Sequence, residues 1–334
     1  MKQSGRFAAA PGRGGRNGDS MKGVFKGAGA LIGLLTAAEA GSTAYFYRRT
    51  MIRSNAKTER TMKMSGVDWK KYLPMMKERR EWMMEQPHED VWIISHDGLK
   101  LHGTYFKGAE GDKAVICFHG YTSQGLNDYG SLSQYYLKRG YRMLLIDERA
   151  HGQSEGQHIG FGVMDRLDGK RWVEWMVEKA GEDVQILLHG NSMGGATVLM
   201  MSGLDLPVQV KGIISDCAFT SMKDVFTHVL HSMYHIPAFP IIQIASRINR
   251  KKVGYGLDDC NSAREVRKAK IPILFIHGDK DVFVPCRMTE EAWRNCASPK
   301  TKLIVKEAGH GESYYKDTEG YERAMDSFIG GVIK

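Results

Sequence analysis

The chain has 334 residues, of which 42% are apolar and 25% charged, a composition typical of an enzyme-sized globular protein. Its formal net charge of +9 arises within residues 1–63, where twelve Lys and Arg residues accompany three acidic ones, while the other residues carry 35 charges of each sign. A catalytic domain that binds nucleic acid would need a basic surface of its own, so this balance argues against that class.

The N-terminal region begins with residues 1–26, which are basic and Gly-rich without periodicity, and we expect them to be disordered. Residues 27–47 then form a run of 21 residues with one charge, Glu39, and a membrane span needs about 20 residues. We therefore expect a single-pass anchor and a membrane-associated protein, since basic flanks suit a membrane surface. Six Lys and Arg residues lie on each side of the run, so charge does not fix its orientation, and we favour the extracytoplasmic side.

Two alternatives remain for residues 27–47. Ala38-Glu39-Ala40 resembles a signal-peptidase site, so the run could be a cleaved signal peptide. It could also be a helix that packs on the enzyme, or a disordered tail.

The next region, residues 48–90, is charged and rich in Met, and we expect a helical linker that packs against a catalytic domain of residues 91–334. That domain opens with a predicted hairpin, Val91–His96 and Leu101–Phe106, around an Asp97-Gly98 turn. Helical patterns then alternate with apolar strands, which predicts a mainly parallel sheet. The predicted strands are 113–118, 141–146, 184–189, 210–215, 271–276 and 302–306.

Residues Gly190-Asn191-Ser192-Met193-Gly194 read G-x-S-x-G between the strand 184–189 and a helix-like stretch at 196–201. Strand, tight turn and helix are the context of a nucleophile elbow, where glycines leave room for a serine on a strained turn. Ser192 is therefore the candidate nucleophile.

A serine hydroxyl needs a base to accept its proton, and the base needs a carboxylate to fix its tautomer. The loop after the strand 271–276 carries Asp279 and Asp281, and His310 follows the strand 302–306. Open α/β sheets hold their sites at the carboxyl ends of such strands. Position alone leaves both aspartates open as the acid, and Asp216 after the strand 210–215 is a third candidate.

Four motifs give the chain from about Val91 onward its resemblance to the α/β-hydrolases. The branch that it resembles most holds serine aminopeptidase-like and bile-acid-CoA-thioesterase-like serine hydrolases. The motifs are the elbow, the H-G loop Cys117–Thr122, the D-x-R-G-x-G-x-S loop Asp147–Ser154 with Ala150 and His151 as departures, and H-G-x-x-D-x-x-V-P at His277–Pro285.

This resemblance implies the α/β-hydrolase fold, a mainly parallel eight-stranded sheet flanked by helices. It also implies a small helical lid after strand 6, at about residues 221–256. The apolar residues of that lid would close over Ser192 and shape an acyl pocket, or else they complete the core.

The resemblance also assigns roles in the site. Ser192 would be the nucleophile, His310 the base and Asp281 the acid, because the H-G-x-x-D-x-x-V-P motif favours Asp281 over Asp279. The backbone N–H groups of Tyr121 and Met193 would form the oxyanion hole.

No cofactor or metal is expected. His228, His231 and His235 lie at i, i+3 and i+7 on one helical face, but no Cys or acidic ligand has a suitable spacing to them. We expect these histidines to line or cover the pocket.

The sequence therefore predicts a membrane-associated serine hydrolase that cleaves a small-molecule carboxylic ester through an acyl-enzyme. The alternatives are an acyl-CoA thioesterase, acyltransferase or peptidase on the same fold. A non-catalytic binding protein is a further alternative. Such proteins usually lack a member of the triad, however, and this chain keeps all three.

Overall fold

A computed structural model describes residues 41, 43–53, 65–108 and 111–334. Eight strands form one sheet in the order β1-β2-β4-β3-β5-β6-β7-β8, with β2 antiparallel to both of its neighbours and the rest parallel. The strands are β1 His88–Ile94, β2 Lys100–Phe106, β3 Lys113–Phe118, β4 Arg142–Ile146, β5 Gln185–Asn191, β6 Val210–Asp216, β7 Ile273–Gly278 and β8 Lys300–Val305.

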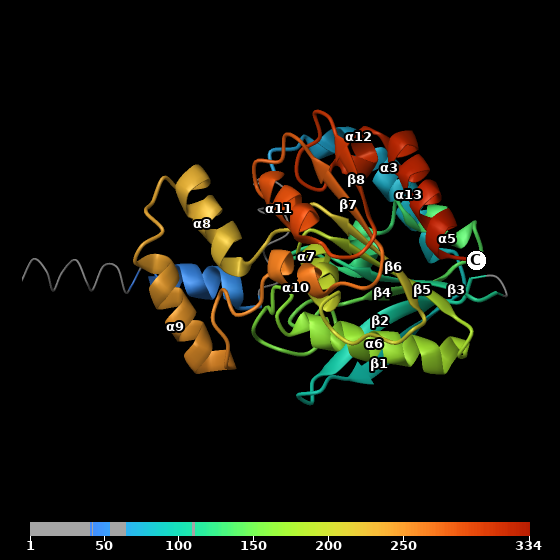
Figure 1. Ribbon diagram of the computed structural model, residues 1–334, viewed down its shortest axis with the longest axis horizontal. Coiled ribbons are helices and arrows are strands. Elements are labelled where there is room, and N and C mark those ends of the chain that lie inside the picture. Colours follow the sequence, from blue (N-terminus) through green and yellow to red (C-terminus); the bar gives the residue numbers. More distant parts are fainter. Residues whose placement is uncertain (1–40, 42, 54–64, 109–110) are drawn as a thin grey trace, which may run out of the picture.

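Helices cover both faces of this sheet (Figure 1). The central strands are therefore buried on both sides and read as continuous apolar runs, as in Ile273–Gly278. One face carries α3 Leu73–Met84, α5 Ser133–Leu137, α12 Ser313–Lys316 and α13 Thr318–Val332. The other carries α6 Asp165–Ala180, α7 Met193–Met201, α10 Ser262–Glu265 and α11 Arg287–Asn295. Three further short helices are η1 Trp69–Lys71, α4 Gly125–Asp128 and η2 Val266–Lys268.

The predicted α/β-hydrolase fold is confirmed by this strand order and by the helices on both faces. Each expected strand is present, with ends that differ by a few residues. The hairpin starts earlier than expected because His88 pairs with Phe106, and β5 runs on to Asn191 because that residue pairs with Asp216. These ends depend on the partner strand, which local apolar patterns do not show.

The predicted lid region between β6 and β7 contains two helices, α8 Met222–Met233 and α9 Ile241–Val253. The Ser221 side chain caps α8 by accepting from the Asp224 N–H, and Gly254 ends α9 in the left-handed conformation. Both helices lie to one side of the sheet, with the helical residues 43–51 running between them (Figure 1).

The helical residues 43–51 are part of the enzyme's packing. Tyr47 is 4% exposed and its phenol donates to Asn249 Oδ1 of α9 at 2.9 Å. Backbone bonds then continue from this helix to the loop after β4: Ile159 N–H donates to Met51 O at 2.8 Å and Arg53 N–H to Gln157 O at 2.9 Å.

Most of the predicted anchor, residues 27–40 and 42, lies outside the described residues. Its far end, residues 43–47, continues as one helix through the expected boundary at 47/48 and lies against the lid. Within the described ranges, no helix combines the length and the apolar character that crossing a membrane requires.

We predict that Tyr47→Phe destabilises the protein by about 1–3 kcal/mol, because it leaves the buried Oδ1 of Asn249 without its donor. Urea denaturation would measure this change. Tyr45→Phe is the matched control, since Tyr45 is 59% exposed and should change stability by less than about 0.5 kcal/mol. Equal stability of the two variants would show that the hydrogen bond between Tyr47 and Asn249 does not stabilise the fold.

Candidate active site

Ser192 lies on a sharp turn between β5 and α7. Its backbone has φ +54° and ψ −108°, a conformation that residues other than Gly rarely adopt. The turn needs both flanking glycines, because a Cβ on Gly190 would lie 2.1 Å from the Gly194 carbonyl oxygen, and one on Gly194 would lie 1.9 Å from Phe118 O. The turn predicted as a nucleophile elbow thus brings the backbone at Gly194 close to the backbone at Phe118.

The three residues predicted as a triad come together at the carboxyl edge of the sheet. Ser192 Oγ lies 2.8 Å from His310 Nε2, and His310 Nδ1 lies 2.7 Å from Asp281 Oδ2. All three side chains are buried. The other oxygen of Asp281 accepts from the backbone N–H groups of Phe283 and Val284 at 2.9 and 2.8 Å, which fixes the carboxylate.

The other two acids considered from the sequence have different partners. Asp279 is exposed and accepts from the Glu307 N–H at 2.7 Å. Asp216 accepts from Ser313 Oγ at 3.2 Å, and its carbonyl accepts from the Ser192 N–H at 2.8 Å. In the part of the chain that the structure describes, Asp281 is thus the one of the three with a hydrogen bond to His310.

The electrostatics of the pair suit proton transfer. Burial would raise the pKa of Asp281, but the nearby His310 and His277 hold it well below its ordinary value. Burial would lower the pKa of His310, but the charge and hydrogen bond of Asp281, with the charges of Asp216 and Asp128, raise it. An ionised Asp281 therefore orients a histidine that binds a proton readily.

The candidate oxyanion donors come from two segments, the start of α7 and the loop after β3. Met193 is the first residue of α7, where backbone N–H groups have no acceptor within the helix. Tyr121 lies in the loop after β3, and both Tyr121 and Ser192 line the same cavities. The assignment of these two N–H groups to an oxyanion hole stays a prediction from the sequence.

Two residues that sequence reasoning did not place hold the loop of Tyr121. The Gly120 N–H donates to Asp128 Oδ2 at 2.6 Å, and the Thr122 N–H donates to His151 Nε2 at 3.1 Å. Asp128 also accepts from the Asn191 side chain at 3.2 Å and so joins this loop to the elbow. His151 is one of the two departures from the loop motif after β4, which is the signal that could have drawn attention to it.

Two cavities meet at Ser192. One of about 90 Å³ lies beneath the lid among residues of α8, α9 and the helical residues 43–51. The other, of about 660 Å³, lies along α3 and η1 on the opposite side and also reaches His310. The residues expected to be a helical linker that packs against the catalytic domain therefore also form a wall of the site.

The three lid histidines do not converge on one point. His228 Nε2 lies 2.9 Å from the Val282 carbonyl, next to Asp281. His231 Nε2 accepts from the Ala238 N–H at 3.3 Å, and His235 has a positive φ at the turn after α8. His228 thus links the lid to the loop that carries the acid.

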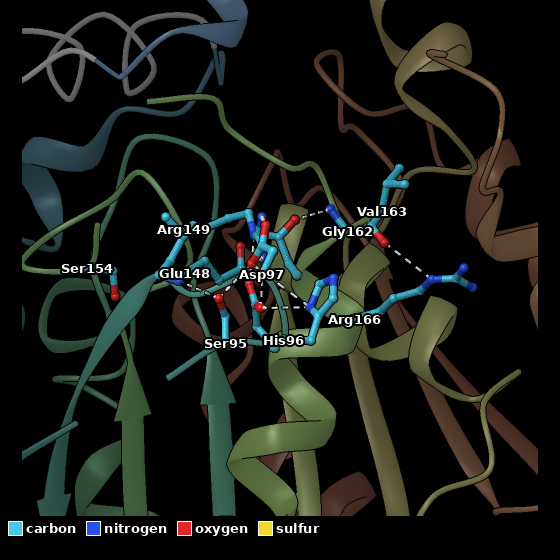
Figure 2. Close-up of polar contacts among 12 residues, drawn as sticks. Ser95, His96, Asp97, Glu148, Arg149, Ser154, Gly162, Val163 and Arg166 are labelled. Atoms are coloured by element: carbon cyan, nitrogen blue, oxygen red, sulfur yellow. Dashed lines mark hydrogen bonds and ion pairs between the residues drawn. The ribbon is translucent and has the colours of Figure 1, made fainter. Parts of the chain in front are cut away.

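A buried charge cluster supports the loops beside the site (Figure 2). The Arg149 guanidinium pairs with Asp168 of α6 at 2.7 and 2.8 Å and with Asp97 of the β1–β2 turn at 3.0 and 3.1 Å. The neighbouring Glu148 is 2% exposed. Burial, and then the charge of Asp165, raise the pKa of Glu148 well above its ordinary value, while burial raises that of Asp165 to about 6.

Comparison with known proteins agrees with this architecture. The family model for the alpha/beta hydrolase fold matches residues 113–237. The uncharacterized protein YqkD of Bacillus subtilis is 27% identical over 249 residues, covering 74% of this chain and 81% of YqkD. Protein bem46 of Schizosaccharomyces pombe is 26% identical over 256 residues, covering 75% of this chain and 78% of bem46.

Solved structures show the same fold. The Pyrococcus furiosus esterase Pf2001 superposes with a TM-score of 0.63 at 21% identity, covering 76% of this chain and 94% of the esterase. An esterase of Exiguobacterium antarcticum gives a TM-score of 0.54 at 17% identity, covering 72% of this chain and 99% of that one. The branch within the superfamily stays a prediction from the sequence.

We predict that the free energy of unfolding depends less on pH in Glu148→Gln than in the wild-type protein. The folded-state pKa of Glu148 is raised, so its contribution to stability is complete below the unfolded pKa near 4.5 and is lost as pH rises through the folded value. The gap between the unfolding free energies at pH 5 and pH 8 should therefore be smaller in Glu148→Gln than in the wild-type protein.

The exposed Glu291→Gln is the control, because it removes a carboxylate without changing a buried one. Equal gaps in the two variants would mean that Glu148 is ionised in the folded protein.

We also predict that Asp281→Asn lowers kcat by about 10⁴-fold, because an amide favours the wrong imidazole tautomer. Asp279→Asn keeps an acceptor for the Glu307 N–H and should have little effect. Hydrolysis of p-nitrophenyl acetate would test both variants. If kcat fell further in Asp279→Asn than in Asp281→Asn, Asp279 would be the acid that orients His310.

Proposed function

We propose that this chain, a member of the α/β-hydrolase superfamily, is a serine hydrolase that cleaves a carboxylic ester through an acyl-enzyme. The observation that supports this most directly is the chain of contacts Ser192 Oγ–His310 Nε2–His310 Nδ1–Asp281 Oδ2, at 2.8 and 2.7 Å across its two hydrogen bonds. The strained elbow supports it further, because strain of this kind persists where the surrounding backbone enforces it.

In the first half-reaction, His310 Nε2 accepts the proton of Ser192 Oγ as that oxygen attacks the ester carbonyl. The N–H groups of Met193 and Tyr121 then stabilise the negative charge on the carbonyl oxygen, a contribution of roughly 2.7–4 kcal/mol for one donor. The bond to the leaving alcohol breaks, and His310 returns its proton to that alcohol. Asp281 stays ionised throughout and holds the imidazole tautomer.

In the second half-reaction, His310 deprotonates a water that attacks the acyl group on Ser192. The bond between the acyl carbon and Oγ breaks, the acid leaves, and the proton returns to Ser192. The cycle uses side chains and backbone groups of this chain together with water.

Thioester and amide substrates differ from an ester in the leaving group and use the same nucleophile. Parallel assays with p-nitrophenyl esters, acyl-CoA thioesters and peptide anilides would rank the three classes. A binding protein without catalysis would turn over none of them.

Membrane association through residues 27–47 stays a prediction from the sequence. If these residues anchor the protein, their far end at residues 43–47 would hold the lid close to the membrane surface, because Tyr47 contacts α9.

We predict covalent labelling of Ser192 by a fluorophosphonate. The proximity of His310 to Ser192 Oγ makes this hydroxyl the activated one. Mass spectrometry should place the adduct on the peptide that contains Ser192, and Ser192→Ala should abolish both labelling and ester hydrolysis. Ser202→Ala, at the end of α7, is the control. Labelling of another residue, or full activity in Ser192→Ala, would contradict the proposal.

A further inference from the structure

One wall of the larger cavity carries apolar side chains that come from outside the region matched by the family model. Trp69 of η1 and Leu73, Met76 and Met84 of α3 line one side, and the cavity reaches Ser192 and His310 on the other. Its volume of about 660 Å³ is within the range of about 300–1,000 Å³ that small-molecule sites occupy.

The segment that forms this wall is fixed to the His310 loop. Lys71 Nζ and Tyr72 Oη donate to Glu312 Oε1 at 2.8 and 2.7 Å, and the Gly309 N–H donates to the other oxygen of Glu312 at 2.8 Å. Burial would raise the pKa of Glu312, but these donors lower it, so the carboxylate stays charged. Glu312 thus connects the wall of the cavity to the loop that carries the candidate base.

The other end of the wall is fixed as well. Arg79 of α3 donates to Tyr314 Oη at 2.5 Å and to the Ser131 carbonyl at 3.2 Å. Arg80 donates to Asn127 Oδ1 at 2.7 Å. Because η1 and α3 are tied at both ends to loops of the catalytic edge, the cavity between them and Ser192 is a built feature of the fold.

The chemistry of the lining indicates the kind of group that fills it. An aliphatic chain gains about fourfold in affinity for each methylene that it removes from water, whereas a polar group would lose hydrogen bonds there. Among the charged side chains that line the cavity, Lys77, Arg80 and Glu81 of α3 are exposed. Asp128 and Asp216 line its end at the catalytic edge, where they accept from the Gly120 N–H and from Ser313 Oγ. Leu73 and Met84 are also 48% and 38% exposed, so the cavity has an apolar mouth.

The two cavities differ strongly in capacity. The space beneath the lid, about 90 Å³, fits only a short group, while the space along α3 is about 660 Å³. Ser192 lines both, and an ester bound at Ser192 has two arms that must extend in different directions.

We propose that the substrate is an ester with one long aliphatic arm, which lies in the cavity walled by η1 and α3, and that Met76 limits the length of this arm. This inference rests on the proposed function, because the arm is attached to the carbonyl that Ser192 attacks.

The test compares Met76→Trp with Met75→Trp. Both substitutions place the same side chain on α3, but Met75 does not line the cavity. The ratio of kcat/KM for p-nitrophenyl palmitate to that for p-nitrophenyl butyrate should fall by at least about 10-fold in Met76→Trp. The larger side chain would exclude several methylenes of the palmitoyl chain from the cavity. The ratio should keep its wild-type value in Met75→Trp. Should Met76→Trp not fold, Met76→Lys would place a charge at the same position.

A binding measurement keeps the two proposals separate. The long-chain fluorescent acid cis-parinaric acid should bind to Ser192→Ala protein, and adding Met76→Trp should weaken binding by at least about 10-fold. Hydrolysis that persists in Ser192→Ala would overturn the proposed function. Hydrolysis that depends on Ser192 but has the same palmitate-to-butyrate ratio in both Trp variants would overturn the aliphatic arm alone. Absence of cis-parinaric acid binding would overturn it too, whatever the turnover.

Discussion

The close approach of two backbones at the elbow is the constraint on which the rest of the site depends. Gly194 lies so near Phe118 O that a Cβ would come within 1.9 Å of it. This contact fixes the end of β5 against the end of β3, and the Gly194 N–H donates to the His119 carbonyl at 3.0 Å. The turn that exposes Ser192 and the loop that carries Tyr121 are therefore set by one contact. A nucleophile and its oxyanion donors need such mutual placement, because an error of about 1 Å is costly in catalysis.

The chain outside the hydrolase motifs contributes as much to the shape of the site as the lid does. Residues 43–51 pack between α8 and α9, and η1 with α3 forms a wall of the larger cavity. These two segments line different cavities that meet at Ser192. In the proposed function, the sheet would supply the reacting groups and the N-terminal segments would enclose the substrate. A common fold can in this way acquire a particular substrate range without changing its catalytic residues.

The sequence predicted those parts of the fold and site that depend on local backbone geometry. Ser192, Asp281 and His310 each follow a strand that contains a run of three or more apolar residues, so their positions at the sheet edge could be inferred. The contacts of Glu312 with Lys71 and Tyr72, and of Tyr47 with Asn249, join residues about 200 or more positions apart. No local pattern marks such pairs. The Met-rich stretch predicted packing, but not that Met76 would face the site while Met75 would not.

Glu312 couples the shape of the substrate cavity to the position of the candidate base. Its two oxygens bind different elements, one the segment of Lys71 and Tyr72 and the other the backbone of Gly309, which immediately precedes His310. A shift of η1 would therefore move the carboxylate and, through it, the loop of His310. Since His310 must stay within hydrogen-bonding distance of both Ser192 and Asp281, the wall of the cavity has little freedom to move. For the aliphatic arm that we propose, a rigid wall would set a fixed length, and the same contacts of Glu312 would then govern both the position of the candidate base and the selection of the substrate.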